Sequence, residues 1–365
     1  MGEALTSLEV EIRRRIAMAG PMPVGQYMRL CLTHPDFGYY MTHDPFGPLG
    51  DFTTAPEISQ MFGELVGLWA ASVWRQMGAP ENVRLVELGP GRGSMMLDVL
   101  RAGHIVPSFR KAVVIHMVEV SPALEQRQRQ ALTGSEIHAE WHRSLEEVPD
   151  GPMIILANEF FDSLPVQQAI MCADGWHERV VRIDDDKRLA FGHARDPLPL
   201  FDQMLLPPQV RAAQIGEIFE WRTDQTALEL GHRVVRSNGA ALVVDYGHLK
   251  SATGETLQAV CAHGFVDPLA TPGGADLTAH VDFQALAQAA ESMGARTHGP
   301  LDQAEFLRRL GIDSRGEALK VAAPHKADEI DQARERLTNE ATTGMGALFK
   351  AIGFSHPKLG PLPCF

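Results

Sequence analysis

The chain has 365 residues, 45% of them hydrophobic, which is sufficient to bury the core of one enlarged catalytic domain. Its formal net charge of -13 at pH 7 argues against broad, sequence-independent binding to nucleic acid, because such binding needs Lys and Arg to neutralise phosphates. The four cysteines are scattered without a Cys-x-x-Cys pair and no long apolar run occurs, so we predict no disulfide framework, no thiolate zinc site and no transmembrane helix.

The N-terminal block, residues 12–75, is predicted to be mostly helical, apart from two aromatic or glycine-rich segments at 34–40 and 47–60. In the second segment, Thr54 followed by Ala-Pro-Glu is typical of a helix N-terminus, with Thr54 or a neighbour as the cap. Its N–H groups and hydroxyls would face a ligand crevice; the alternative is a capped surface helix.

The most informative segment is residues 83–93, an apolar strand that leads into a Gly-x-Gly-x-Gly turn before a predicted helix. Glycines allow a sharp turn and a close approach of the backbone to a ligand. Ser94 stands where the Gly-x-Gly-x-x-Gly pattern of dinucleotide sites has its third glycine, so a dinucleotide is disfavoured. Glu87 would repel a pyrophosphate but suits a cationic amine, such as the amino-acid end of S-adenosylmethionine.

Strands and helices alternate after this turn, which predicts a parallel sheet with helices on both faces. Glu119, Glu159 and Asp245 stand at the ends of three predicted strands. Such ends lie at one edge of a parallel sheet, where ligands bind, so we expect three carboxylates on one rim. Strands are expected at 112–120, 137–141, 153–157 and 241–245, and helices at 94–102, at 123–132 and before Ser237.

Two stretches interrupt the alternation. Residues 166–193 alternate apolar and polar side chains around turn sequences, which indicates an antiparallel hairpin inserted between the fourth and fifth strands. A proline-rich connector is expected at 197–208. The glycine-rich stretch 254–278 has little periodicity and is interpreted as a lid or a binding loop.

Other chemistries of α/β chains lack their motifs. His138, Glu140 and His142 form His-Ala-Glu-Trp-His on a strand-like stretch, not the helical His-Glu-x-x-His of a zinc protease. A Gly-x-Ser-x-Gly nucleophile elbow and a phosphate loop are both missing from the sequence, which disfavours the commonest hydrolases and nucleotidases.

The remaining concentrated signal is Asn-Glu-Phe-Phe-Asp, which directly follows the apolar strand expected at 153–157. Asn158 and Glu159 are acceptors suited to a nitrogen nucleophile, and they should lie beside the glycine turn. Phe160 and Phe161 either pack on a cation and shield the reacting centre, or only plug the core under the sheet edge.

Five motifs together make the chain resemble the MidA family, the S-adenosylmethionine-dependent methyltransferases that include the mitochondrial complex I assembly methyltransferase. The resemblance spans about residues 12–349. The motifs are HPDFGYY at 34–40, GDFTTAPEISQMFG at 50–63, ELGPGRG at 87–93, NEFFDSLPV at 158–166 and DLTAHVDF at 276–283.

The resemblance implies an α/β fold of the class I methyltransferase, or Rossmann-like, type. Its seven-stranded sheet would have an antiparallel last strand, here at about 347–354, with a helical N-terminal extension and inserted segments. We expect the domains to be residues 1–80, a helical extension with a loop that covers cofactor or substrate, and residues 81–365, the core. Insertions would occupy about 166–220 and 250–280.

The site residues follow from the same resemblance. Gly89, Gly91 and Gly93 would form the turn beneath the methionine part of the cofactor, with Glu87 near its amine, and Glu119 would bind both ribose hydroxyls. The adenine neighbours would be Trp141 and His142, whereas Asn158 and Glu159 would flank the transferring methyl, with Asp162 and Asp245 as further acids for a guanidinium. Thr53, Thr54, Pro56, Ser59 and Gln60 would close over the cofactor or substrate. No metal is expected, because a sulfonium already activates the methyl group.

The function expected from the resemblance is transfer of a methyl group from S-adenosylmethionine to an arginine of a protein partner, such as a respiratory complex subunit. Two alternatives are a small-molecule N- or O-methyltransferase and a cofactor-binding assembly factor without turnover; an NAD-dependent oxidoreductase is disfavoured by the glycine spacing. Glu3, Glu9 and Glu11 are atypical of a mitochondrial leader, so we expect a bacterial cytoplasmic protein, or a processed form in the mitochondrial matrix. The sequence does not indicate the oligomeric state.

Overall fold

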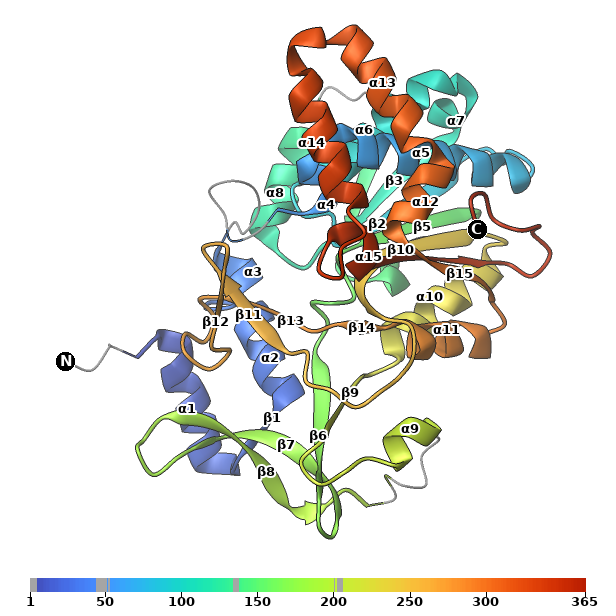
Figure 1. The fold of residues 1–365 in the computed structure, drawn as a ribbon. Coiled ribbons are helices and arrows are strands. Elements are labelled where there is room, and N and C mark those ends of the chain that lie inside the picture. The colour runs from blue at the N-terminus through green and yellow to red at the C-terminus, as the bar shows by residue number, and fades with distance from the viewer. Residues whose placement is uncertain (1–4, 44–50, 52, 134–137, 200, 202–205) are drawn as a thin grey trace. The chain divides into compact units, whose positions relative to one another are not determined.

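The computed structural model describes residues 5–43, 51, 53–133, 138–199, 201 and 206–365 (Figure 1). The described chain divides into two compact units, which we treat separately. Unit 1 comprises Met1–Phe52, Asp162–Thr223 and His248–Gln284, and unit 2 comprises Thr53–Phe161, Asp224–Gly247 and Ala285–Phe365. Residues 47–50 and 52, the start of the strand expected at 137, and part of the connector at 197–208 lie outside the described residues. The domain boundaries expected from the sequence stay a prediction.

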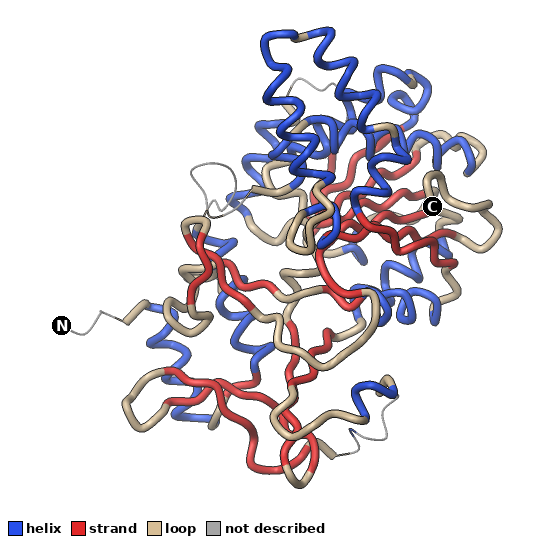
Figure 2. The backbone as a smooth tube through the Cα atoms, viewed as in Figure 1, coloured by secondary structure: helices blue, strands red, loops and turns tan. Residues whose placement is uncertain are grey.

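Unit 2 contains a twisted sheet whose main path runs β15-β16-β10-β5-β2-β3-β4 (Figures 1 and 2). The central pairs β4/β3, β3/β2, β2/β5 and β5/β10 are all parallel, whereas β16 is antiparallel to both β10 and β15. The predicted antiparallel last strand is therefore confirmed. The strands are β2 (Val83–Leu88), β3 (Val113–Val118), β4 (Ala139–His142), β5 (Met153–Asn158), β10 (Ala240–His248), β15 (Arg296–Asp302) and β16 (Phe349–Ser355).

Both faces of this sheet are covered, which explains why its central strands are almost continuously apolar. Leu85, Ile154 and Leu242 point into a core that also contains side chains of α5 and α6. The alternate residues of β5 and β10 point to the other face, where α10 buries Leu230 and Val234. Because β2, β3 and β5 run parallel, Glu87 and the end of β5 lie at the edge where these three strands terminate.

The helices of unit 2 begin and end close to their sequence signals. Helix α6 starts at Ser94 immediately after the glycine turn, and Ser121, whose hydroxyl accepts from Leu124 N, caps α8. The helices are α4 (Ala55–Ile58), α5 (Gln60–Gln76), α6 (Ser94–Ala102), α7 (Pro107–Ala112), α8 (Pro122–Ala131), α10 (Gln225–Arg236), α11 (Phe283–Ser292), α12 (Gln303–Leu310), α13 (Ile312–Ala322), α14 (Ala327–Thr338) and α15 (Met345–Leu348), with short 3-10 turns at Gly103–Ile105, Leu145–Glu147 and Pro324–Lys326.

Unit 1 is built on antiparallel strands. Its larger sheet runs β1-β7-β6-β9 with β8 paired to β7, and β11 lies between β12 and β13 in a second sheet. Helices α1 and α2 bury Leu8, Ile12 and Tyr27 against these strands. The elements are α1 (Ser7–Ala19), β1 (Met22–Pro23), α2 (Val24–Thr33), α3 (Tyr39–Thr42), β6 (Val166–Cys172), β7 (Gly175–Ile183), β8 (Leu189–Pro197), α9 (Pro208–Arg211), β9 (Ile218–Arg222), β11 (Gln258–Cys261), β12 (Gly264–Val266), β13 (Asp276–Thr278) and β14 (Val281–Asp282).

The stretch 254–278 has more regular structure than its glycine content suggested. It contributes all three strands of the smaller sheet. Tyr27 Oη donates to Pro268 O at 2.7 Å, which ties α2 to the loop between β12 and β13. Strands of three or four residues are too short to produce a clear period in the sequence. Among the helices of the described residues, none is both long enough and apolar enough to span a bilayer.

Candidate functional site

The glycine turn after β2 has the backbone geometry that only glycine adopts easily. Gly89, Gly91 and Gly93 all have positive φ values, of 61°, 54° and 83°. A Cβ on Gly89 would lie 2.8 Å from Phe160 Cδ2, so the turn also passes close to the segment after β5. Gly93 N donates to Pro90 O at 2.7 Å, which closes the turn at the start of α6. The turn is thus fitted to a close ligand approach on one side and to Phe160 on the other.

Glu87 is a buried carboxylate at the carboxyl end of β2, with 2% of its surface exposed. Within the described part of the chain, its Oε2 atom is fully buried and accepts no hydrogen bond. Burial, and secondarily the charge of Glu119, raise the pKa of Glu87 to about 8. A cationic ammonium at this position would satisfy the acceptor and stabilise the charged carboxylate.

Gln128 organises the next part of the rim from α8. Its Nε2 donates to Gly91 O at 2.8 Å and to Glu119 Oε2 at 2.9 Å, and its Oε1 accepts from Trp141 Nε1 at 2.9 Å. Gln128 is completely buried. This one amide therefore joins three of the residues that the sequence assigned to the site.

Glu119 directly follows β3 and is almost fully buried. Its Oε1 accepts from Ser121 N at 2.8 Å, so both carboxylate oxygens accept hydrogen bonds from the protein. Burial raises its pKa, against the opposing effect of these bonds. A bidentate contact to a vicinal diol is compatible with this arrangement.

The end of β5 carries the second group of predicted residues. Glu159 has a φ of 50°, a strained conformation for a residue other than glycine, and its N donates to Val244 O at 2.9 Å. Its Oε1 accepts from Asn158 Nδ2 at 3.2 Å and from Ala55 N, the first residue of α4, at 2.9 Å. Within the described residues, the buried Oδ1 atom of Asn158 accepts no hydrogen bond. A carboxylate and an amide oxygen are therefore held together beside the glycine turn.

Asp245 secures the strained turn from the neighbouring strand β10. Its Oδ2 accepts from Phe160 N at 3.2 Å and from Phe161 N at 2.9 Å, and its Oδ1 accepts from Tyr246 N at 2.9 Å. The carboxylate is fully buried. These contacts indicate that Asp245 positions the backbone that presents Glu159.

The predicted helix N-terminus at residue 54 is present as α4, which follows Thr54 and contains Pro56 in its first turn. The Thr54 side chain makes no capping hydrogen bond there, but Ser59 caps the next helix through an Oγ that accepts from Met61 N at 3.2 Å. Glu57 accepts a hydrogen bond from Ser94 Oγ, which ties α4 to the helix that follows the glycine turn. Gln60 is exposed and donates to Glu64 Oε1 at 3.2 Å.

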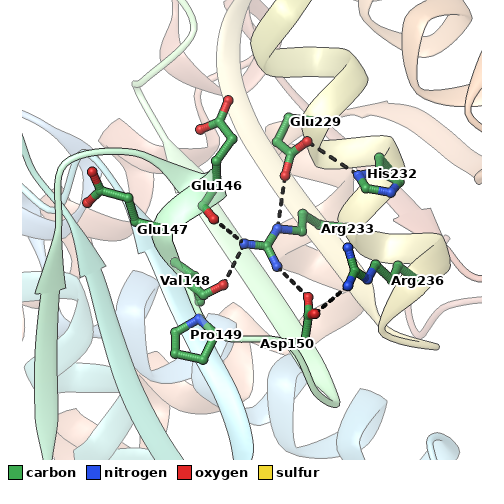
Figure 3. A pocket seen from close by; sticks show the side chains of 9 residues that line it. All are labelled: Glu146, Glu147, Val148, Pro149, Asp150, Glu229, His232, Arg233 and Arg236. Carbon is green, nitrogen blue, oxygen red and sulfur yellow. Dashed lines mark hydrogen bonds and ion pairs between the residues drawn. The ribbon is translucent and has the colours of Figure 1, made fainter.

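His142 ends β4 on the face opposite Trp141. Its Nε2 lies 2.9 Å from Nδ1 of His116 on β3, a contact between two imidazoles that the sequence did not predict. The chain after His142 is held by Arg233 of α10, whose guanidinium donates to Leu145 O at 2.7 Å. It also donates to Glu146 O at 2.9 Å and to Val148 O at 2.5 Å (Figure 3). The hollow in that figure is lined by Glu146, Glu147, Val148, Pro149, Asp150, Glu229, His232, Arg233 and Arg236. It contains none of the predicted site residues, and Arg233 fixes the backbone of this segment.

Asp162 lies in unit 1, whereas the other predicted site residues lie in unit 2. It is buried, and its backbone oxygen accepts from Ala279 N and from Arg222 Nη2, both at 3.1 Å. The sequence missed Gln128 and His116 as members of the site. A buried Gln on an otherwise charged helix leaves no distinct signal in a single sequence, and His116 is hidden within a β-branched strand.

The residues of unit 2 are suited to S-adenosylmethionine. The positive-φ glycines provide a cradle, Glu87 and Asn158 offer buried acceptors, and Glu119 faces the same rim from β3. Glu87 Oε2 and Asn158 Oδ1, which accept no hydrogen bond from the residues that the structure describes, match an ammonium and a reacting nitrogen better than a phosphate.

Comparison with known proteins agrees with this geometry. Residues 65–301 match a family described as "Putative S-adenosyl-L-methionine-dependent methyltransferase". The chain is 39% identical to the "Protein arginine methyltransferase NDUFAF7 homolog, mitochondrial" of Drosophila melanogaster. The match extends over 376 residues and covers 95% of this chain and 84% of the relative. It is 36% identical to "Protein arginine methyltransferase NDUFAF7, mitochondrial" of Homo sapiens, over 94% of this chain and 82% of the relative.

A solved structure has the same fold throughout. A Burkholderia thailandensis protein crystallised with S-adenosyl-homocysteine covers 98% of this chain with a TM-score of 0.87 and 29% identity, and 94% of its own chain is matched. The α/β class I fold expected from the sequence is therefore confirmed, and with it the cofactor of the family. The chain belongs to the S-adenosyl-L-methionine-dependent methyltransferase family that includes the NDUFAF7 proteins.

Proposed function

We propose that this protein transfers a methyl group from S-adenosylmethionine to an arginine side chain of a protein partner. The observation that carries this proposal is the pair Glu159 and Asn158, an acid and an amide held at the end of β5 next to the glycine turn. The names of the relatives, protein arginine methyltransferases, support arginine as the acceptor.

The cofactor would be bound by residues from three strand ends. Glu87 would accept from its amine above the turn of Gly89, Gly91 and Gly93, and Glu119 would accept from its ribose hydroxyls. Trp141, held by Gln128, and the chain at His142 would border the adenine. Thr54, Ser59 and Gln60 would contribute from the segment that begins α4 and α5.

A guanidinium is a stable cation, and its nitrogen attacks only when it is held and aligned. Glu159 would accept hydrogen bonds from the guanidinium, and Asn158 Oδ1 would accept from the nitrogen that attacks. When bound, the cofactor supplies a methyl group already activated by the positive sulfur. The protein would therefore contribute mainly orientation and exclusion of water, with Asp162 as a further candidate acid for the arginine.

The test is a Glu159→Gln variant, compared with Glu305→Gln as a matched control on α12. Glu305 is half exposed and pairs only with Arg309 of its own helix among the contacts observed. Each protein would be incubated with radiolabelled S-adenosylmethionine and a protein extract of cells that lack this enzyme. Methylated arginine would be identified by mass spectrometry, and S-adenosylhomocysteine affinity would be measured by calorimetry.

Loss of protein arginine methylation in Glu159→Gln, with cofactor affinity retained, would support the proposal. Turnover confined to the small-molecule fraction of the extract would instead indicate a metabolite methyltransferase. Cofactor and partner binding without any methyl transfer by the wild-type protein would indicate an assembly factor.

The partner and the location belong to the same proposal. We infer that the acceptor is a subunit of a respiratory complex and that the protein acts in the bacterial cytoplasm or, as a processed form, in the mitochondrial matrix. The relatives are named as mitochondrial, which supports an acceptor of respiratory type. Fractionation of the source cells, with detection by antibody, tests the location directly.

A further inference from the structure

Three ligating side chains meet on one face of the sheet edge formed by β3 and β4. His116 of β3 is paired in register with Glu140 of β4, and His142 follows two residues after Glu140 on the same face. One ligand atom from each of the three lies within 4.8 Å of the other two. His138, two residues before Glu140, donates from its Nε2 to Glu140 Oε1 at 2.9 Å.

The spacing within this cluster is that of a metal site before the ion enters. His116 Nδ1 lies 2.9 Å from His142 Nε2 and 3.8 Å from Glu140 Oε2. Bonds of about 2.1 Å to a tetrahedral zinc ion place ligand atoms roughly 3.4 Å apart, so the two distances bracket the required value. An ion would replace the hydrogen bond that the two imidazoles now share, with both ring nitrogens turned toward it.

The surroundings also suit a bound cation. His116 is buried on the sheet and would be a rigidly held ligand, whereas Glu140 and His138 are open to solvent and leave a path by which an ion can enter. Two imidazoles and one carboxylate form a ligand set that zinc prefers and that leaves a fourth position for water or His138.

We propose that His116, Glu140 and His142 form a binding site for one divalent transition-metal ion, with zinc as the best-matched metal. The ion would tie the edge strand β4 to β3. The two strands are already joined at this point by a backbone hydrogen bond, in which Glu119 N donates to His142 O at 2.9 Å. Glu119 is also the residue expected to accept from the ribose hydroxyls of the cofactor. The site does not depend on the proposed methyl acceptor.

A second cluster, Cys172, His177 and His193 of unit 1, also brings ligand atoms within 4.8 Å of one another. In this cluster both ring nitrogens of His177 already face acceptors: Nδ1 lies 2.9 Å from Ala194 O and Nε2 lies 2.9 Å from Asp174 Oδ1. An imidazole that donates from both nitrogens has no lone pair for a metal. The unit 1 cluster is therefore the poorer site and serves as an internal control.

The test uses the full-length protein without an affinity tag, after treatment with EDTA and removal of the chelator. Zinc chloride would be titrated by calorimetry, cobalt binding would be followed by its visible absorption, and magnesium would serve as a hard-ion control. The variants are Glu140→Gln and His116→Gln, with Cys172→Ser and His193→Gln as controls in the other cluster. Because Glu140 is partly exposed, its variant should keep the wild-type melting temperature in EDTA, which makes it the decisive one.

We expect one equivalent of zinc with a micromolar or lower Kd, and absorption typical of tetrahedral cobalt. Glu140→Gln and His116→Gln should weaken zinc binding by more than the roughly 10–100-fold that loss of an outer partner causes, because each removes a direct ligand. The control variants should bind as the wild type does. No binding below millimolar zinc, binding lost in Cys172→Ser or His193→Gln, or binding unchanged in Glu140→Gln would each overturn the proposal.

Discussion

Replacing Glu87 with Gln should weaken cofactor binding and remove most of its pH dependence. The substitution keeps the shape of the side chain but removes the charge that would meet the amine of the cofactor. A hydrogen bond to a charged group contributes about 1.5–3 kcal/mol, so the Kd for S-adenosylhomocysteine should rise by roughly 10-fold to 150-fold near pH 8.

The pH dependence follows from the buried position of Glu87. Its pKa in the free protein is about 8, so the group is mainly protonated at pH 7, while an ammonium partner favours the carboxylate. Binding therefore releases a proton, and affinity should rise with pH until about pH 8. Between pH 6 and 7.5, where the ligand amine stays mostly protonated, the wild-type Kd should improve by about 24-fold. In Glu87→Gln this slope should vanish, so the two affinities converge toward pH 6.

Stability should respond in the opposite direction. The folded protein holds the Glu87 proton up to about pH 8, whereas the unfolded chain releases it near 4.5, the ordinary pKa of a glutamate side chain. Stability is therefore lost as pH rises through this window, by an amount on the order of 3 kcal/mol at pH 7. Without ligand, Glu87→Gln should gain stability relative to wild type between pH 5 and 8, because the amide has no charge to bury.

Both effects can be measured on the same preparations. Calorimetric titrations in buffers of different ionisation enthalpy count the protons released on binding, and urea unfolding at pH 5 and pH 8 measures the stability difference. Equal pH slopes for wild type and Glu87→Gln, or a stability difference that does not change with pH, would refute the assignment of Glu87 as a neutral group that becomes charged when the cofactor binds.

Three further changes test other parts of the structure. Gly89→Ala should weaken S-adenosylhomocysteine binding at least 10-fold in calorimetry, because the new Cβ meets Phe160 at 2.8 Å. Gly311→Ala, also at a positive φ of 92°, would place its Cβ at least 4 Å from the described residues beyond its chain neighbours, so it should cost a similar backbone strain of about 1–2 kcal/mol and leave the affinity unchanged. Gln128→Leu should lower both the melting temperature and the cofactor affinity. Gly91, Glu119 and Trp141 each lose a buried hydrogen-bond partner, and each loss costs about 1–3 kcal/mol. Gln130→Leu, on the exposed side of the same helix, should change neither quantity. Burial lowers the pKa of His298 to about 4, whereas the unfolded chain takes up this proton near pH 6.5, so unit 2 should become less stable as the pH falls from 6.5 toward 4. In urea unfolding, a His298→Gln variant should therefore lose less stability than the wild type between about pH 7 and pH 5.

Much of the sheet could be predicted from the sequence because its periodicity is strong. The strands expected at 112–120, 153–157 and 241–245 are β3, β5 and β10, and the helix after the glycine turn occupies residues 94–102 as predicted. Buried parallel strands are apolar on both faces, so their runs are long and distinct. The rim position of Glu87 and Glu119 then followed from strand direction alone.

The contacts that hold the candidate site could not be predicted in this way. The positive φ of Glu159 is accompanied by tertiary contacts, because Asp245 accepts from Phe160 N and Phe161 N, which are 85 and 84 residues distant in sequence. The links from Gln128 depend likewise on the way α8 packs over the turn. Periodicity reports which face of an element is buried, but it carries no information on which buried amide meets which carboxylate.

The buried acids of unit 2 differ in how their charge is compensated, and this difference separates their roles. Asp245 accepts three backbone N–H groups, and these bonds suit it to positioning the turn. Glu119 is bonded through both oxygens and keeps lone pairs for a neutral diol. In the described chain, Glu87 has one oxygen that accepts no bond, and a buried acceptor without a partner is costly in a structure that gains nothing from it. The cost is explained if the missing partner is the cationic end of the cofactor, and for that reason Glu87 is the most direct point at which to test the site.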